Sequence, residues 1–186
     1  MLLDEQALQK DPGLVDAKTA IAAMLIAYLA NGRSSAIERD EERAEELLRD
    51  ALEHDPNDAQ ARKILGILRR VQSRLTEAQI ELETSIAVDP NDTFSLRNLG
   101  STLVQMGRPE AAIPYIEKSI RLSPQDPFIA PNYSWLGMCH VLLGHPDQAI
   151  ELLKKAWTAN PRHASYRLWL AGALALKGDL TMRQPR

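Results

Sequence analysis

Apolar residues recur every three or four positions along most of the chain, which is the spacing of one face of an α-helix. The segment TFSLRNLGSTLVQMG at 93–107 has this pattern, and PEAAIPYIEKSIRL at 109–122 repeats it. The apolar or small positions are Leu96, Leu99, Leu103 and Met106 in the first segment and Ala112, Ile116, Ser119 and Ile120 in the second. We therefore predict two helices, with Gly107 ending the first in a left-handed cap and Pro114 bending the second without breaking it.

The same helix pair returns along the chain at a nearly constant interval. DPND occurs at 55–58 and again at 89–92, SPQD follows at 123–126 and NPRH at 160–163, so the first two intervals are equal and the third is slightly longer. Leu-Gly pairs keep step with these turns, and so do small residues at two fixed places before each proline. The pairs are Leu65-Gly66, Leu99-Gly100 and Leu136-Gly137, with Leu170-Ala171 in the fourth place.

Small residues at fixed places let two helices approach closely. We expect Gly100 and Ala112 to lie where the two helices of one repeat touch, and Ser119 to lie under the next repeat's first helix. One such hairpin cannot bury its own apolar face, so neighbouring hairpins must stack on it. The residues around each DPND are then the turn from one hairpin to the next.

This pattern resembles the tetratricopeptide repeat, a helix–turn–helix unit of about 34 residues. The resemblance is carried by the Leu-Gly pairs, by Ala78/Leu82 and Ala149/Leu153, and by the terminal prolines 90, 124 and 161. It implies a right-handed, all-α solenoid over residues 1–178, followed by an irregular tail at 179–186. The predicted units are 15–58, 59–92, 93–126 and 127–163, with partial units at 1–14 and 164–178.

The bulk composition suits a folded helical protein and adds little to this interpretation. Of 186 residues, 45% are hydrophobic and 25% charged, which is ordinary for a soluble domain. The apolar run at 20–30 is too short to cross a bilayer, and the N-terminal sequence does not resemble a signal peptide. With Cys139 as the single cysteine, these features favour a cytoplasmic location.

No enzyme signature is visible in the sequence. It has no phosphate-binding glycine loop, no nucleophile elbow and no zinc-binding His pair of the HExxH type. Cys139 and His140 are adjacent on a predicted helix and therefore diverge by about 100°. We expect no catalytic residue, no cofactor and no metal site. We expect the acidic run at 38–50 to be a solvated face with a Glu45–Arg49 pair.

The resemblance implies that the first helices line a concave groove that holds a peptide or helix of a partner protein. The predicted groove residues are Lys63, Ile67, Arg70, Arg97, Asn98, Ser101, Gln105, Ser134, Trp135 and Met138. Trp157 and Trp169 are expected to serve packing. Lys63, Arg70 and Arg97 would favour an acidic peptide, with binding that weakens as salt rises. Neither nucleic acid nor a membrane is an expected partner.

Two other functions fit the sequence. The stretch at 93–178 is similar to repeat segments of bacterial multidomain signalling proteins such as nucleotidyl cyclases, so the chain could be a regulatory part of a larger protein. Alternatively, its ends could mediate weak self-association. An unpaired helix at each end would expose Leu2, Leu3, Leu8, Leu170 and Leu174, and solenoids usually end in a polar capping helix instead.

Overall fold

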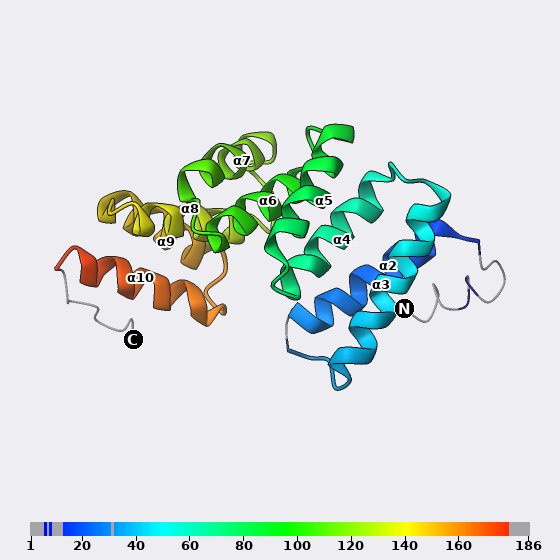
Figure 1. The fold of residues 1–186 in the computed structure, drawn as a ribbon. Coiled ribbons are helices and arrows are strands. Elements are labelled where there is room, and N and C mark those ends of the chain that lie inside the picture. The colour runs from blue at the N-terminus through cyan, green and yellow to red at the C-terminus, as the bar shows by residue number, and fades with distance from the viewer. Residues whose placement is uncertain (1–5, 7, 9–12, 31, 179–186) are drawn as a thin grey trace. The chain divides into compact units, whose positions relative to one another are not determined.

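The computed structural model describes residues 6, 8, 13–30 and 32–178 of the chain. Over 13–30 and 32–178 the backbone forms nine α-helices and no strand (Figure 1). They are α2 (Val15–Ala30), α3 (Ile37–His54), α4 (Ala59–Val71), α5 (Leu75–Val88), α6 (Thr93–Gln105), α7 (Pro109–Leu122), α8 (Ala130–Leu142), α9 (Pro146–Ala159) and α10 (Ala164–Leu176). The predicted all-α fold is confirmed. The helices belong to two compact units, residues 1–90 and 91–186.

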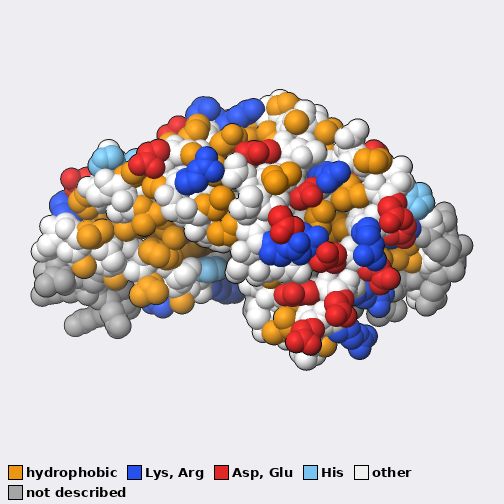
Figure 2. Space-filling view, in the orientation of Figure 1, with side chains coloured by type: hydrophobic (Ala, Val, Ile, Leu, Met, Phe, Trp, Pro, Cys, Tyr) orange, Lys and Arg blue, Asp and Glu red, His pale blue; other side chains and the backbone are white. Residues whose placement is uncertain are grey.

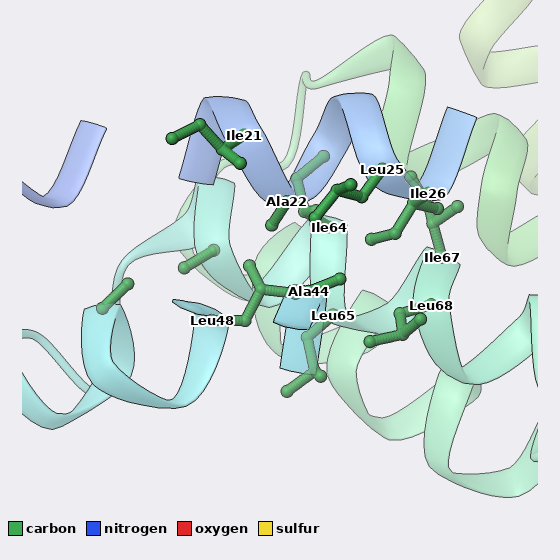
Figure 3. Packing of buried hydrophobic residues seen from close by; sticks show 12 residues of the cluster. Ile21, Ala22, Leu25, Ile26, Ala44, Leu48, Ile64, Leu65, Ile67 and Leu68 are labelled. Atoms are coloured by element: carbon green, nitrogen blue, oxygen red, sulfur yellow. The ribbon is translucent and has the colours of Figure 1, made fainter. Parts of the chain in front are cut away.

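The N-terminal unit is built around a core shared by three helices. Helices α2 and α3 pack together, α4 packs on both of them, and α5 packs on α4. Figure 3 shows the buried side chains of this core, among them Ile21 of α2, Leu48 of α3 and Leu68 of α4. Each of these three is fully buried, and burial of such a side chain contributes about 1.5–3 kcal/mol.

The C-terminal unit consists of two hairpins and one further helix. Helix α6 packs on α7 and α8 on α9, while α7 joins the two hairpins through α8. Helix α10 packs against α9 and α8. The first helices α6, α8 and α10 are therefore neighbours and form one face of this unit.

The glycine of each Leu-Gly pair lies at the contact between the two helices of a hairpin. A Cβ atom on Gly137 would stand 2.7 Å from Cγ of Leu153, and one on Gly66 would stand 2.7 Å from Cγ of Leu82. Gly100 faces Ile116 in the same way. The predicted close approach at Gly100 is confirmed.

The repeated DPND segments have a second role besides the turn. Their last residue is the N-cap of the following helix: the Asp58 side chain accepts hydrogen bonds from the main-chain N–H groups of Gln60 and Ala61. Asp92 accepts from Phe94 and Ser95 in the same way. Such a cap stabilises a helix by about 1 kcal/mol, so the same four residues end one repeat and start the next.

Left-handed residues follow all five of the described first helices, beginning with Gly32 after α2, which has a φ of 63°. Gly107, Gly144 and Gly178 have φ of 73°, 72° and 78°, as a glycine cap requires. The equivalent place between α4 and α5 is occupied by Ser73, whose φ is 60°. The sequence did not reveal this strained position, because no glycine marks it.

The first hairpin is longer than the others, in agreement with the longer predicted unit at 15–58. Helices α2 and α3 have 16 and 18 residues, whereas the later helices have 13 or 14. Helix α7 continues without a break through Pro114. The partial unit expected at 164–178 contains α10.

The expectation that Leu170 faces solvent is wrong. Leu170 is 1% exposed and packs with Ala149 and Leu153 of α9, and Leu174 is half-buried against the same cluster. The inner face of α10 is covered because the preceding hairpin already supplies its partner. Leu8 is half-buried against the N-terminal core, while Leu2, Leu3 and the tail at 179–186 lie outside the described residues. Self-association through the chain ends stays a prediction, without Leu170 as a contact.

Candidate functional site

A cavity of about 310 Å³ opens between α8 and α10 on the face formed by the first helices of the C-terminal unit. We call it the aromatic pocket. Its lining residues are Pro131, Ser134, Trp135 and Met138 of α8 and His163, Ser165, Tyr166 and Trp169 at the start of α10. Figure 2 shows hydrophobic side chains gathered over this unit, whereas charged side chains crowd the N-terminal unit.

Helical spacing brings these side chains to one place. Trp135 and Met138 are three positions apart on α8, as Tyr166 and Trp169 are on α10, so each pair shares a helix face. Trp135 and Trp169 are separated by one repeat length and therefore hold the same place in successive repeats. The repeat thus sets two indole rings on either side of the pocket.

Three lining residues near the start of α10, His163, Ser165 and Tyr166, are held by contacts with their neighbours. Tyr166 is 5% exposed and packs with Ala130 and Ala156. The His163 ring stacks on the Tyr166 ring with centroids 4.5 Å apart. Nδ1 of His163 and Oγ of Ser165 are 2.7 Å apart and hydrogen-bonded. These contacts hold His163, in the connection before α10, against the first turn of that helix.

Trp169 remains open to a partner. It is 38% exposed, and Trp135 is half-buried. Trp169 was expected to serve packing, and His163, Ser165 and Tyr166 were not predicted as part of a site. The separation of the two tryptophans by one repeat length was the signal that could have found it.

Arg97 lies on α6, beside the same face. It is half-buried, and its Cζ stands 4.5 Å from the centroid of the Phe94 ring. Burial lowers the pKa of Arg97, and the charges of Asp126, Tyr166 and Asp92 act against that effect. Burial raises the pKa of Tyr166, and the charge of Arg97 acts in the opposite direction. Helix α6 packs against α8, and Arg97 stands two residues before the Leu-Gly pair of α6, the place that the pocket residue Ser134 holds in α8.

The other predicted groove residues of the C-terminal unit have different surroundings. Ser134, Trp135 and Met138 line the aromatic pocket. Asn98 and Ser101 are buried. Asn98 donates from Nδ2 to the Phe94 carbonyl over 2.8 Å, and Ser101 donates from Oγ to the Asn98 carbonyl over 2.9 Å. Their polar groups are therefore used within α6. Gln105 is exposed at the end of that helix.

The remaining predicted groove residues belong to α4 of the N-terminal unit. Lys63 and Arg70 are half-buried. Ile67 is 8% exposed and belongs to the core cluster. Ile67 is therefore a packing residue, because the apolar face of α4 turns it toward α2 and α3.

Charged residues of the N-terminal unit pair across helices. Arg69 donates to both carboxylate oxygens of Glu45, over 2.7 and 2.8 Å, and Arg62 donates to Glu81 over 2.7 Å. The Glu45–Arg69 bond is the main cause that lowers the pKa of Glu45. Glu45 thus pairs with Arg69 of α4. The predicted partner was Arg49, which lies on α3 together with Glu45. These two ion pairs connect α3 to α4 and α4 to α5.

Nothing in the geometry of the described residues suggests catalysis. Cys139 is fully buried, and burial raises its pKa to about 12, so its thiol is not a nucleophile near neutral pH. Burial also lowers the pKa of His140. Across residues 13–30 and 32–178 there is no group of three or more His, Cys, Asp or Glu side chains that could hold a metal ion. Among the described helices, none has the length and apolarity needed to span a membrane.

Sequence comparison identifies the repeat. One family model of the tetratricopeptide repeat matches residues 92–159, and a second matches residues 38–92 and 140–181. Together these matches cover more than half of the chain. A comparison with curated proteins gave no match.

Solved structures with the same fold are numerous. Pseudomonas aeruginosa pilF is 25% identical with a TM-score of 0.73, over 88% of this chain and 70% of its own. PilW, described as a widely conserved type IV pilus biogenesis factor, is 22% identical with a TM-score of 0.74, over 87% and 70%. YrrB, described as a TPR protein with an unusual peptide-binding site, is 21% identical with a TM-score of 0.66, over 96% and 85%.

Proposed function

The chain belongs to the tetratricopeptide repeat family, and from this we propose that it binds a peptide segment of a partner protein along the first-helix face of its C-terminal unit. Repeats of this family generally mediate protein interactions, so the family supports an interaction module. The binding mode and the anchor point are our proposal.

The observation that carries the proposal is the aromatic pocket. Binding hot spots in protein interfaces are enriched in Trp, Tyr and Arg that line well-packed pockets. The pocket combines Trp135, Tyr166 and Trp169 on two helices, and Arg97 lies on α6, which packs against α8. Trp169 keeps an exposed indole face that a partner segment could cover.

The size of the pocket favours a side chain over a whole cofactor. Its volume of about 310 Å³ is at the low end of the range of roughly 300–1,000 Å³ for small-molecule sites. One or two side chains of a longer segment would fill it, with the rest of the segment lying along α8 and α10. YrrB, which has a peptide-binding site by its description, has the same fold.

A peptide library displayed on phage tests the proposal. Peptides selected on the whole protein should lose affinity for the Trp135→Ala and Trp169→Ala variants, because removing an aromatic anchor costs about 2 kcal/mol or more. The matched control is Leu122→Ser, which removes an exposed apolar side chain from α7, outside the pocket. Fluorescence anisotropy of labelled peptides gives the affinities.

Two results would contradict the proposal. Selected peptides that bind the double variant Trp135→Ala/Trp169→Ala as well as the natural protein would show that the pocket is not the anchor. A protein that selects no peptide from a diverse library would exclude binding of short segments altogether.

A further inference from the structure

Three aromatic side chains that line the aromatic pocket, Trp135, Tyr166 and Trp169, carry hydrogen-bond donors. An indole N–H can only donate, and two of the lining residues, Trp135 and Trp169, each carry one. Within the part of the chain that the structure describes, no hydrogen bond uses either indole N–H or the Tyr166 hydroxyl. None of the lining residues is an aspartate or a glutamate. A ligand rich in acceptor oxygens would therefore complement the site.

Arg97 adds a permanent positive charge beside this pocket. Its guanidinium stays protonated in proteins and presents five N–H donors. Among the described residues, no carboxylate forms an ion pair with it. The carboxylates whose charges act on Arg97 are those of Asp126 and Asp92. Each accepts a main-chain hydrogen bond, Asp92 from Ser95 N over 3.1 Å and Asp126 from Phe128 N over 2.8 Å, and neither bonds directly to the guanidinium.

This arrangement contrasts with the arginines of the N-terminal unit. Arg62 and Arg69 each bond directly to a glutamate. The C-terminal half of the sequence also has an excess of positive charge, because residues 93–186 contain 11 Lys and Arg against 6 Asp and Glu, a net charge of +5. Such an excess attracts anionic ligands and raises their rate of association.

We propose that the aromatic pocket and Arg97 together select a segment in which a large aromatic or apolar side chain stands next to an aspartate or glutamate. The apolar side chain enters between Trp135 and Trp169, and the neighbouring carboxylate reaches the Arg97 guanidinium. Arg97 is the specificity residue, and the tryptophans are the anchor. This inference rests on the proposed function and names its ligand.

Three blocked peptides test the ligand chemistry. The probe is acetyl-Gly-Asp-Phe-Asp-Gly-amide, which has no terminal carboxylate. Its partners replace both Asp residues with Asn, or the Phe residue with Ala. Each is titrated into ¹⁵N-labelled whole protein, and the indole N–H signals of the three tryptophans are followed by NMR. Trp157 lies on α9 outside the pocket lining and is the internal control.

The acidic aromatic peptide should move the Trp135 and Trp169 signals more than the Trp157 signal, because Trp157 packs on the Tyr166 cluster without lining the pocket. The Asn peptide should bind at least about tenfold more weakly, since a hydrogen bond to a charged group contributes about 1.5–3 kcal/mol. The Ala peptide should bind more weakly still. These comparisons change only the ligand, so they do not depend on how a variant protein folds.

Two charge variants assign the carboxylate to Arg97. In Arg97→Gln, the difference in affinity between the Asp and Asn peptides should fall below about twofold, because the direct charge-assisted bond is lost. Arg121→Gln removes one positive charge from the exposed surface of α7 in the same unit and should keep the tenfold difference. Circular dichroism checks that both variants are folded.

The outcomes separate this inference from the proposed function. If the Asn peptide moves the Trp135 and Trp169 signals at the same concentration as the Asp peptide, the acidic preference is wrong and peptide binding in the pocket stands. If none of the three probes moves these signals while library-selected peptides do, the ligand chemistry is wrong and the proposed function again stands. If no peptide of either kind moves them, both are wrong.

Discussion

Asn132 on α8 donates a hydrogen bond from Nδ2 to Oγ of Ser119 on α7, over 3.1 Å. Ser119 donates in turn from Oγ to the carbonyl oxygen of Thr93 on α6, over 2.9 Å. One hydroxyl group therefore connects three helices of the C-terminal unit. Ser119 is 1% exposed and Asn132 is 2% exposed, so water cannot easily replace these bonds.

Ser119→Ala should destabilise the protein by about 1–3 kcal/mol, because it leaves the buried Asn132 amide without its acceptor. Asn132→Ala in the same chain should cost less than it does alone, since the partner is already gone. Urea denaturation of the two single variants and the double variant measures this coupling. Additive effects would show that the Asn132–Ser119 bond contributes nothing to stability.

Two glycines in first helices should respond oppositely to alanine. Gly100→Ala should cost about 1–3 kcal/mol, because the new methyl group overlaps Ile116. Gly172 of α10 has no atom within 4 Å of an added Cβ, so Gly172→Ala should stabilise the helix by about 0.5–1 kcal/mol. Thermal melting followed by circular dichroism decides between the two signs. A stabilising Gly100→Ala would place the α6–α7 contact elsewhere.

Ser73→Gly should raise stability. A residue with a Cβ pays about 1 kcal/mol or more in the left-handed region that Ser73 occupies, and glycine does not. Ser73→Ala is the matched control, because it removes the hydroxyl but keeps the Cβ. If both variants melt at the same temperature, the left-handed backbone is not the cause of any change.

Asp50→Asn should destabilise the N-terminal unit at neutral pH. Nζ of Lys18 lies 2.6 Å from Oδ2 of Asp50, and the Lys18 side chain is 5% exposed. Removing the carboxylate leaves this buried ammonium group without its counter-charge, at a cost of about 1–3 kcal/mol. Urea midpoints at pH 7 give the difference between the variant and the natural protein.

The same pair gives a pH dependence of defined sign. The hydrogen bond from Lys18 is the main cause that lowers the pKa of Asp50. The folded state therefore binds this proton less readily than the unfolded state does. The stabilisation is present above the unfolded pKa of about 3.9. It is lost as pH falls through the lower folded pKa. The difference between Asp50→Asn and the natural protein should accordingly shrink between pH 7 and pH 3; a constant difference would exclude the charge of Asp50 as its source.

The sequence predicts the helices well because one rule repeats. The constant interval between the prolines locates each turn, and the small residues locate each close contact, as Gly100 and Gly137 illustrate. The left-handed backbone at Ser73 could not be predicted from the residue type, because serine does not favour that region. Only the repeat interval, which aligns Ser73 with Gly107, indicates it. For the first hairpin, the sequence showed only that the unit is longer than the others. It did not show where the two helices of that hairpin end.

The site is less predictable because it depends on tertiary partners. Glu45 has a plausible partner four positions away, yet it bonds to Arg69 from the next helix. The bidentate geometry makes that longer-range pair stronger than an i,i+4 pair. Leu170 was assigned to an uncovered end, but the α9 side of the preceding hairpin covers it. Trp169 is exposed because the first-helix face extends onto α10, a property of the stacked arrangement rather than of one helix.

The buried thiol of Cys139 can report how often the helices around it open. It is the single thiol of the sequence, and it is 0% exposed on α8 with a pKa of about 12. A thiol reagent in solution can reach it only after α8 separates from the helices around it. The rate of labelling, measured by mass spectrometry on the natural protein, therefore reports how often α8 separates from these helices. A ligand bound between α8 and α10 would lower the labelling rate of Cys139. Its binding can therefore be followed without adding a fluorophore or a new cysteine to the protein.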